Sequence, residues 1–129
     1  MGDRANIVIK QHIAHDDVGE IYFYTHWSGW RLPIILQEAL KNGRSSWDDE
    51  SDLARIIFLE HDEGGFRISS RLLDNEYPLL QVDTEDKTVT IRDERAEPNE
   101  GFPIPFEKFI SLDLSDNPWE TLHELKEAA

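Results

Sequence analysis

Apolar and polar residues alternate over residues 20–27, Glu-Ile-Tyr-Phe-Tyr-Thr-His-Trp, and this alternation predicts a β-strand. Tyrosine, phenylalanine, threonine and isoleucine favour the pleated, half-buried surface of a sheet. With a period of two residues, one face of the strand carries Ile21, Phe23, Thr25 and Trp27. The opposite face carries Tyr22, Tyr24 and His26. We expect the first face to join the core and the strand to end near Ser28, before Gly29.

A shorter apolar run precedes this strand. Residues 6–11, Asn-Ile-Val-Ile-Lys-Gln, predict another strand, and residues 12–19 form a polar link between the two. Strands so close in sequence are expected to pair as an antiparallel hairpin. Burial should fix their register, with Ile7 and Ile9 on the same face as Ile21 and Phe23.

The period then changes to that of a helix. Residues 32–40 place leucine, isoleucine and alanine at helical spacing, with Pro33 in the first turn and Gly43 as a stop signal. A second helix is predicted to begin near Asp48, because the acidic residues that follow suit the positive end of a helix. It is expected to end at Gly64-Gly65.

Strand periodicity returns in the second half of the chain. Residues 66–73 alternate, and residues 80–83 and 88–92 predict a hairpin around the turn 84–87. Its apolar face consists of Leu80, Val82, Val89 and Ile91. Residues 93–105 predict an exposed loop, and residues 106–114 a helical turn followed by a short strand. A last helix begins at Pro118, with Asn117 as its cap.

Together these elements predict an α+β fold in one domain, residues 1–129. The sheet should be largely antiparallel, with a helical pair inserted after the first hairpin and a helix at the C-terminus. Strands that are separated by short links favour this class over a parallel α/β sheet.

Charge is the strongest compositional feature. The chain has 13 basic and 27 acidic residues, a net charge of −14. Residues 1–47 hold five of each sign, so residues 48–129 carry the whole excess. Direct binding to nucleic acid or to an anionic membrane is not expected of such a chain. The excess acid favours either solubility alone or attraction to a basic protein partner.

Other absences narrow the class of protein. The sequence has no cysteine, which excludes disulfides, thiolate metal sites and cysteine nucleophiles. It also lacks a long apolar run, a signal peptide and a phosphate-binding glycine loop. We therefore expect a cytoplasmic protein without a cofactor.

The candidate binding residues gather at one end of the first hairpin. In an antiparallel pair the start of the first strand meets the end of the second, so residues 4–6 should lie near residues 26–30. Polar groups and aromatic rings that converge in this way are typical of a ligand site. The predicted site consists of Arg4, Asn6, Tyr22, Tyr24, His26, Trp27 and Trp30. The same pattern also fits a capped core, with Trp27 buried, His26 bonded to the backbone and Arg4 paired with a carboxylate.

Two further patterns suggest chemistry less strongly. Residues 12–17, His-Ile-Ala-His-Asp-Asp, contain ligands that zinc accepts, but they lie in a predicted turn and lack the usual helical spacing. Residues 61–63, His-Asp-Glu, are similar, and we predict no metal at either place. A hydrolase would need a base such as His26, yet none of the serines occurs in a Gly-x-Ser-x-Gly turn.

The residues Arg4-Ala5-Asn6-Ile7-Val8 and Tyr24-Thr25-His26-Trp27 resemble a type of small bacterial and phage protein. Those proteins begin with an Arg-Ala-Asn strand and continue with a Tyr-x-His-Trp strand. The resemblance covers about the first quarter of the chain. It implies that the two strands form a unit, and it implies no reaction.

The sequence thus favours a small acidic binding domain that recognises a small polar ligand or a protein partner through the aromatic end of the first hairpin. The alternatives are an acidic inhibitor that mimics nucleic acid and binds a basic partner, and a hydrolase that uses His26.

Overall fold

The computed structural model describes residues 2–14, 17–60, 65–96 and 100–129. Six strands, four α-helices and one short 3-10 turn follow one another among these residues. They are, in chain order, β1 (Ala5–Ala14), β2 (Asp17–Thr25), α1 (Leu32–Asn42), η1 (Arg44–Ser46), α2 (Glu50–Glu60), β3 (Arg67–Ser69), β4 (Leu79–Asp83), β5 (Thr88–Arg92), β6 (Phe102–Pro105), α3 (Phe106–Ser111) and α4 (Pro118–Ala128).

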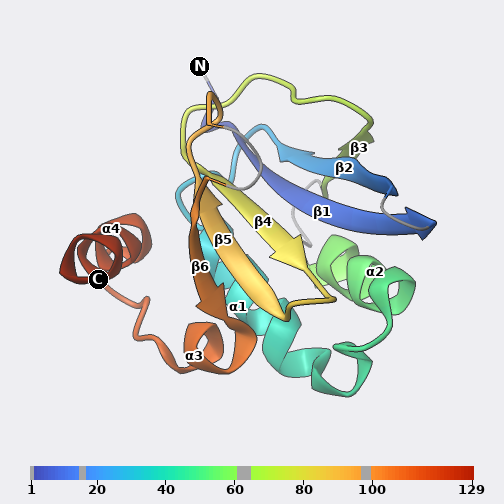
Figure 1. Cartoon of the computed structure of the whole chain (residues 1–129). Coiled ribbons are helices and arrows are strands. Elements are labelled where there is room, and N and C mark those ends of the chain that lie inside the picture. Colours follow the sequence, from blue (N-terminus) through green and yellow to red (C-terminus); the bar gives the residue numbers. More distant parts are fainter. Residues whose placement is uncertain (1, 15–16, 61–64, 97–99) are drawn as a thin grey trace.

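The strands form one sheet in the order β3-β2-β1-β4-β5-β6 (Figure 1). β1 and β4 run parallel, and every other neighbouring pair is antiparallel. A parallel pair needs a long crossover, and here the chain supplies it through β2, α1, α2 and β3. The fold is therefore α+β with a largely antiparallel sheet, a helical pair after the first hairpin and a C-terminal helix, as predicted.

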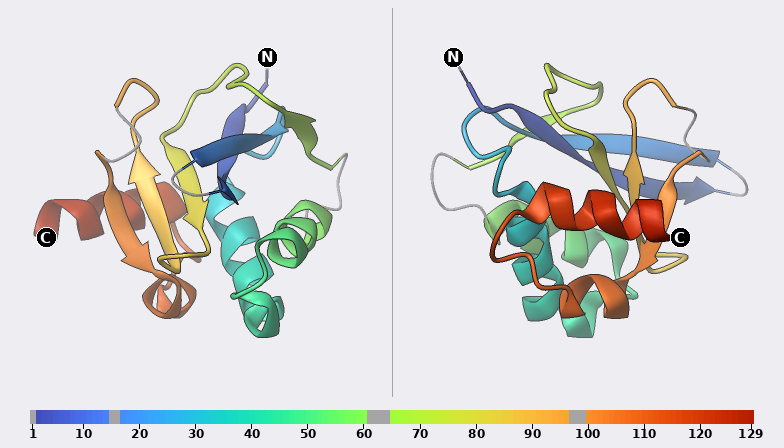
Figure 2. Two further views of the ribbon diagram at one scale, coloured as in Figure 1. Left: turned by 45° about the vertical axis from the view of Figure 1, so that its right-hand side comes forward. Right: turned by 90° about the vertical axis from the view of Figure 1, so that its left-hand side faces the viewer.

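One face of the sheet carries the core. α1 crosses behind β4 and β5 in Figure 1, and the side view in Figure 2 shows α4 running beside the sheet. The strands contribute Ile7, Ile9, Phe23, Leu80, Val82 and Val89 to this face, all of them buried. The helices contribute Leu36, Leu40, Leu53, Ile57 and Leu122 to the same cluster. Burying one such side chain contributes about 1.5–3 kcal/mol, so this cluster is the main source of stability.

The register of the first hairpin matches the prediction. Ile7 pairs with Phe23 and Ile9 with Ile21, which places all four side chains on the core face. The second hairpin is also confirmed, because Leu80 pairs with Ile91 and Val82 with Val89. In both hairpins a shift of one residue would turn the apolar set towards water.

Several boundaries were predicted wrongly. The first hairpin is longer than expected, since β1 reaches Ala14 and β2 begins at Asp17, where a polar link was predicted. β3 has only three residues. Residues 102–105 form β6 instead of an exposed loop, and residues 106–111 form α3 with no strand after it. The prolines at 103 and 105 are compatible with a strand because β6 lies at the edge of the sheet.

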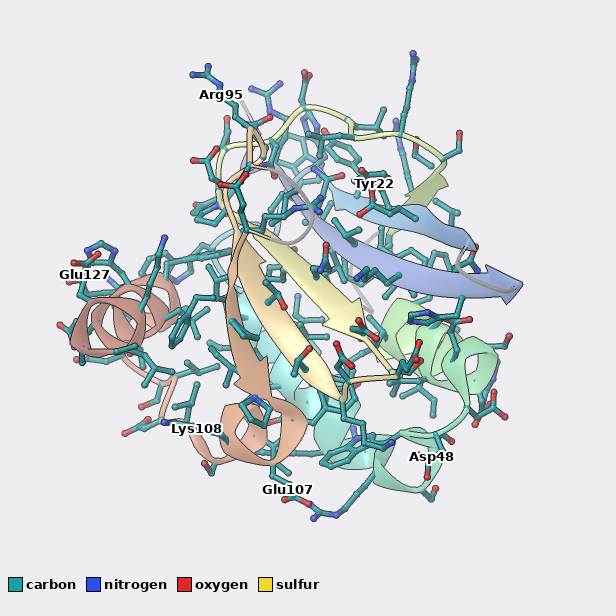
Figure 3. All side chains as sticks on the ribbon, in the orientation of Figure 1. Tyr22, Asp48, Arg95, Glu107, Lys108 and Glu127 are labelled. Atoms are coloured by element: carbon teal, nitrogen blue, oxygen red, sulfur yellow. The ribbon has the colours of Figure 1, made fainter. Side chains whose placement is uncertain are left out.

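The opposite face of the sheet carries no helix among the described residues, and we call it the helix-free face. Its side chains come from the alternate positions of the same strands, among them Lys10, Tyr22, Tyr24, Gln81, Thr90 and Arg92. In Figure 3 the labelled Tyr22 lies on this face, whereas the labelled Asp48, Glu107 and Glu127 point outwards at the margin of the fold. Within the described residues, no helix has the length and apolar character needed to cross a membrane.

Candidate functional site

Asp3 holds the aromatic end of the first hairpin together. Its backbone N–H donates to the carbonyl oxygen of His26 at 2.7 Å, and its carbonyl oxygen accepts from the N–H of Gly29 at 2.8 Å. Its carboxylate accepts from the N–H of Trp30 at 2.8 Å and from the hydroxyl of Tyr77. One residue thus fixes three positions of the loop that follows β2.

A second set of contacts holds the same loop against α4. The indole Nε1 of Trp119 donates to the carbonyl oxygen of Gly29 at 2.9 Å, and the Trp119 ring stacks on the Tyr77 ring at 4.9 Å between centroids. A Cβ atom at Gly29 would lie 2.6 Å from Cε2 of Tyr77 and 2.8 Å from the carbonyl oxygen of Asp3. Only glycine therefore fits at this position without displacement of its neighbours.

The two tryptophans of this loop lie at the surface. Trp27 is 67% exposed and Trp30 is 43% exposed, whereas Trp47 of the core is 8% exposed. Trp27 was predicted on the core face, and this prediction is wrong because β2 ends at Thr25 and the chain turns away before residue 27. The Trp27 ring meets the His26 ring edge-on, 4.4 Å between centroids. We call the exposed rings of Trp27 and Trp30 the tryptophan surface.

Tyr24 and His26 lie beside this surface. The Tyr24 hydroxyl and Nδ1 of His26 share a hydrogen bond of 2.9 Å, whose direction depends on the tautomer of His26. Tyr24 is buried, so its ring is part of the packed hairpin as well as a neighbour of the loop. This nitrogen of His26 is engaged with a phenol and not with a serine nucleophile.

Tyr22 lies further from the loop. Its hydroxyl donates to Glu20, and burial together with the nearby Glu20 carboxylate raises the pKa of Tyr22 above its usual value. The phenol therefore remains neutral at physiological pH, and it faces the helix-free side of β2 and not the tryptophan surface.

Arg4 and Asn6 anchor a neighbouring segment, residues 73–76. The Asn6 side-chain amide donates to the carbonyl of Asp74 at 3.3 Å and to Oδ1 of Asn75 at 3.2 Å. The Arg4 guanidinium pairs with Asp74 and Glu76, as the capped-core alternative anticipated. The backbone N–H and the guanidinium of Arg4 lower the pKa of the Glu76 carboxyl, so the pair is charged near neutral pH. Asn6 and Arg4 thus position a loop.

That loop forms one wall of an open groove of about 620 Å³. The groove is also lined by Tyr24 and Arg67, which pair across β2 and β3, and by Arg71 and Glu94. The groove adjoins the predicted site, because Tyr24 belongs to both.

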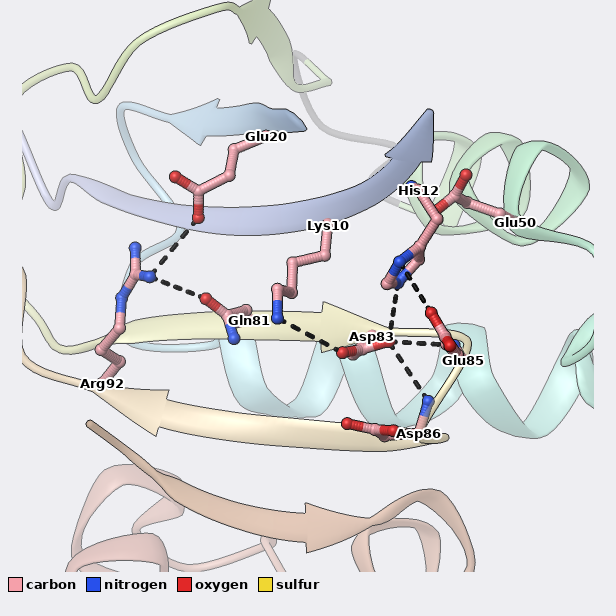
Figure 4. A network of polar contacts seen from close by, with 9 residues as sticks. All are labelled: Lys10, His12, Glu20, Glu50, Gln81, Asp83, Glu85, Asp86 and Arg92. Atoms are coloured by element: carbon pink, nitrogen blue, oxygen red, sulfur yellow. Dashed lines mark hydrogen bonds and ion pairs between the residues drawn. The ribbon is translucent and has the colours of Figure 1, made fainter. Parts of the chain in front are cut away.

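A second polar cluster lies at the other end of β1 (Figure 4). Nε2 of His12 lies 3.2 Å from Asp83, and Nδ1 lies 2.8 Å from Glu85. Burial of Asp83 opposes its ionisation, but the backbone N–H of Asp86 and the His12 ring outweigh it and lower the pKa of Asp83. The cluster ties β1 to the β4–β5 turn.

No group of three or more histidine and acidic side chains within the described ranges is arranged to hold a metal ion. His15 and Asp16 of the first candidate, and residues 61–63 of the second, lie outside those ranges.

Further along the helix-free face, Arg92 is almost fully buried. Its guanidinium donates to Oε1 of Gln81 at 2.7 Å and to Glu20 at 3.4 Å (Figure 4). A buried charge needs such partners, and this one links β5, β4 and β2 across the sheet. These hydrogen bonds have a structural role, because they compensate for the burial of the Arg92 cation.

Sequence reasoning missed Asp3, Tyr77, Arg67 and Arg71. A carboxylate near the N-terminus gives no local signal of the loop that it will bind. The sequence gives a stronger signal for Arg67, because the β2–β3 pairing places it opposite Tyr24 once β3 is recognised. Comparison with protein-family models, with curated proteins and with solved structures finds no match for this chain.

Proposed function

We propose that this protein is a binding domain that recognises a basic protein partner through the tryptophan surface, Trp27 and Trp30. The observation that carries the proposal is the exposure of both rings on a loop whose backbone is held in place, 67% for Trp27 and 43% for Trp30. A protein partner fits this surface better than a small ligand does, because the rings face outwards and do not line an enclosed cavity.

Covering exposed aromatic surface is energetically favourable in water. A tryptophan buries up to about 250 Å² of surface in a packed environment. Covering the exposed part of Trp27 would therefore contribute on the order of 3 kcal/mol to association. Tryptophan is also enriched among the residues that dominate the energy of protein interfaces.

The loop that carries both rings is already ordered in the free protein. The hydrogen bonds from Asp3 and Trp119 hold residues 26–30 in one conformation before any partner arrives. A partner would then lose little conformational entropy from this side of the interface. A loose loop with the same two rings would bind more weakly.

The charge of the chain indicates the kind of partner. With a net charge of −14, the chain attracts a basic protein from a distance and repels nucleic acid. Association should consequently be faster at low salt, while the buried rings determine the rate of dissociation.

Differential capture tests the proposal. The wild-type protein and the Trp27→Ala/Trp30→Ala variant are immobilised and exposed to the same lysate of the natural host. Leu59→Ala is the matched control, because Leu59 is 62% exposed and lies on α2. A protein retained by the wild type and by the control but lost from the double variant supports the proposal. Equal retention by all three would contradict it.

A further inference from the structure

We propose that the groove beside Tyr24 binds an anionic group, a carboxylate or a phosphate, through Arg67 and Arg71. This site is separate from the tryptophan surface, because neither ring of that surface lines the groove. The inference therefore goes beyond the proposed function and can fail or succeed without it.

Arg67 and Arg71 have no carboxylate partner among the residues that the structure describes, although the chain is rich in carboxylates. The chain has 27 acidic residues for 13 basic ones. Arg4, Arg44, Arg55 and Arg92 each form an ion pair. Among the described residues, Arg31, Arg67, Arg71 and Arg95 form none, and of these four only Arg67 and Arg71 line the groove. Two guanidinium groups that line one groove, and that form no ion pair within the described ranges, are an arrangement that recognises carboxylate or phosphate oxygens.

The strand pairing and the loop that follows β3 place both arginines at the groove. Arg67 pairs with Tyr24 across β3 and β2, so their side chains share the helix-free face. Arg71 follows two residues after the end of β3 and lines the same groove. Two guanidinium groups thus line one space beside the Tyr24 ring, and both supply hydrogen-bond donors to an anion.

Hydrogen bonds from a buried side chain fix one wall of the groove before a ligand binds. This wall is fixed to β1 through Asn6, which is fully buried and donates to the carbonyl of Asp74 and to Oδ1 of Asn75. Asp74, one of the two acidic residues that line the groove, is already paired with Arg4. The wall therefore does not supply the missing partner for Arg67 and Arg71.

The volume of the groove indicates the kind of molecule to which the anionic group is attached. A volume of about 620 Å³ is larger than a single phosphate or carboxylate requires. Leu72 and Leu73 line the same wall, so an apolar body attached to the anion would contact them. Glu94 also lines the groove, so the two arginines have to outweigh its charge. The class of ligand is thus an organic carboxylate or phosphate with an apolar part.

Titration by NMR tests this site with two simple probes, phenylacetate for the carboxylate and phenyl phosphate for the phosphate. The amide spectrum and the Nε–Hε signals of arginine are followed at constant ionic strength, with sodium chloride as the reference. We expect saturable shifts at Arg67, Arg71 and Tyr24 with at least one probe. A stronger response to one probe identifies which anion the groove prefers.

The variants Arg67→Gln and Arg71→Gln should each weaken binding of the preferred probe at least about tenfold, because each loses a charge-assisted contact. Arg31→Gln is the matched control, an arginine without an ion pair among the described residues that does not line the groove. Thermal melts check that all three variants fold. Shifts no larger than those with sodium chloride, or equal weakening in Arg31→Gln, would overturn the proposal.

Discussion

Removal of the Asp3 carboxylate should loosen the aromatic end of the molecule without unfolding the core. Asp3→Ala deletes the acceptor for the N–H of Trp30 at 2.8 Å and for the hydroxyl of Tyr77. The two backbone bonds of residue 3, to His26 and Gly29, remain. The substitution therefore isolates the contribution of the carboxylate to the loop.

The magnitude follows from the two lost bonds. A hydrogen bond to a charged group contributes about 1.5–3 kcal/mol, and partial exposure places these two near the lower limit. The free energy of unfolding should fall by about 2–3 kcal/mol, which lowers the melting temperature by roughly 8–12 °C in a domain of this size. Asp3→Asn keeps one acceptor oxygen and should show about half of the loss.

Two assays together decide the result. Thermal melts give the change in stability, and amide hydrogen exchange should accelerate at Gly29 and Trp30 while the core strands stay protected. Asp74→Ala is the control, because it breaks only an exposed pair with Arg4. If Asp3→Ala melts like the wild type, or if exchange accelerates equally in β1 and β4, the loop is not held by Asp3 and the reasoning is refuted.

Two further predictions concern the packing around the site. Burial, together with the hydrogen bond to Asp3, raises the pKa of Tyr77 to about 12, above an unfolded value of about 10. The folded state thus favours the neutral phenol, so its stabilising effect is complete below pH 10 and is lost as the pH rises towards 12. Tyr77→Phe should remove the last step of the tyrosinate absorbance titration, and a wild-type titration that is complete near pH 10 would contradict the assignment. Phe23 is buried against Phe58 and Phe66, with centroids at 5.4 and 5.9 Å. Phe23→Ala should cost about 3–5 kcal/mol in a denaturant titration, whereas the exposed Ile68→Ala should change little, and similar losses for both would contradict the core assignment.

Local pattern was sufficient where one face of a strand or helix is buried. The pairings of Ile7 with Phe23 and of Leu80 with Ile91 follow from alternation, because only one register keeps these side chains out of water. The cap of α4 is equally local, since Asn117 accepts from the N–H of Glu120 three residues later.

Long-range contacts explain most of what the pattern could not predict. Residues 102–105 form β6 because they pair with the edge of β5. The sequence of these residues does not encode that pairing by itself. Tyr24 was assigned to an open site, yet it is buried, and residues 72–75, which are far from it in sequence, line the same groove. The parallel pairing of β1 with β4 is of the same kind.

The proximity of the two chain segments at the aromatic end of the first hairpin was predicted, but their contacts were not. Antiparallel pairing was enough to bring residues 3–6 and 26–30 together. The exposure of Trp27 was not predictable from the period of the strand, because β2 ends at Thr25 and its alternation does not extend to residue 27. The roles of Arg4 and Asn6 depend on residues 73–76, which lie far away in sequence.

The affinity of Trp27→Ala for the partner isolated by differential capture tests the central claim most directly. Isothermal titration of wild type, Trp27→Ala and the control Leu59→Ala against that purified partner gives three dissociation constants. Without the Trp27 ring, association loses about 3 kcal/mol of free energy from buried apolar surface. This loss predicts a dissociation constant about a hundredfold higher for Trp27→Ala and an unchanged value for Leu59→Ala. A dissociation constant for Trp27→Ala equal to that of the wild type would contradict the claim that the tryptophan surface is the binding site.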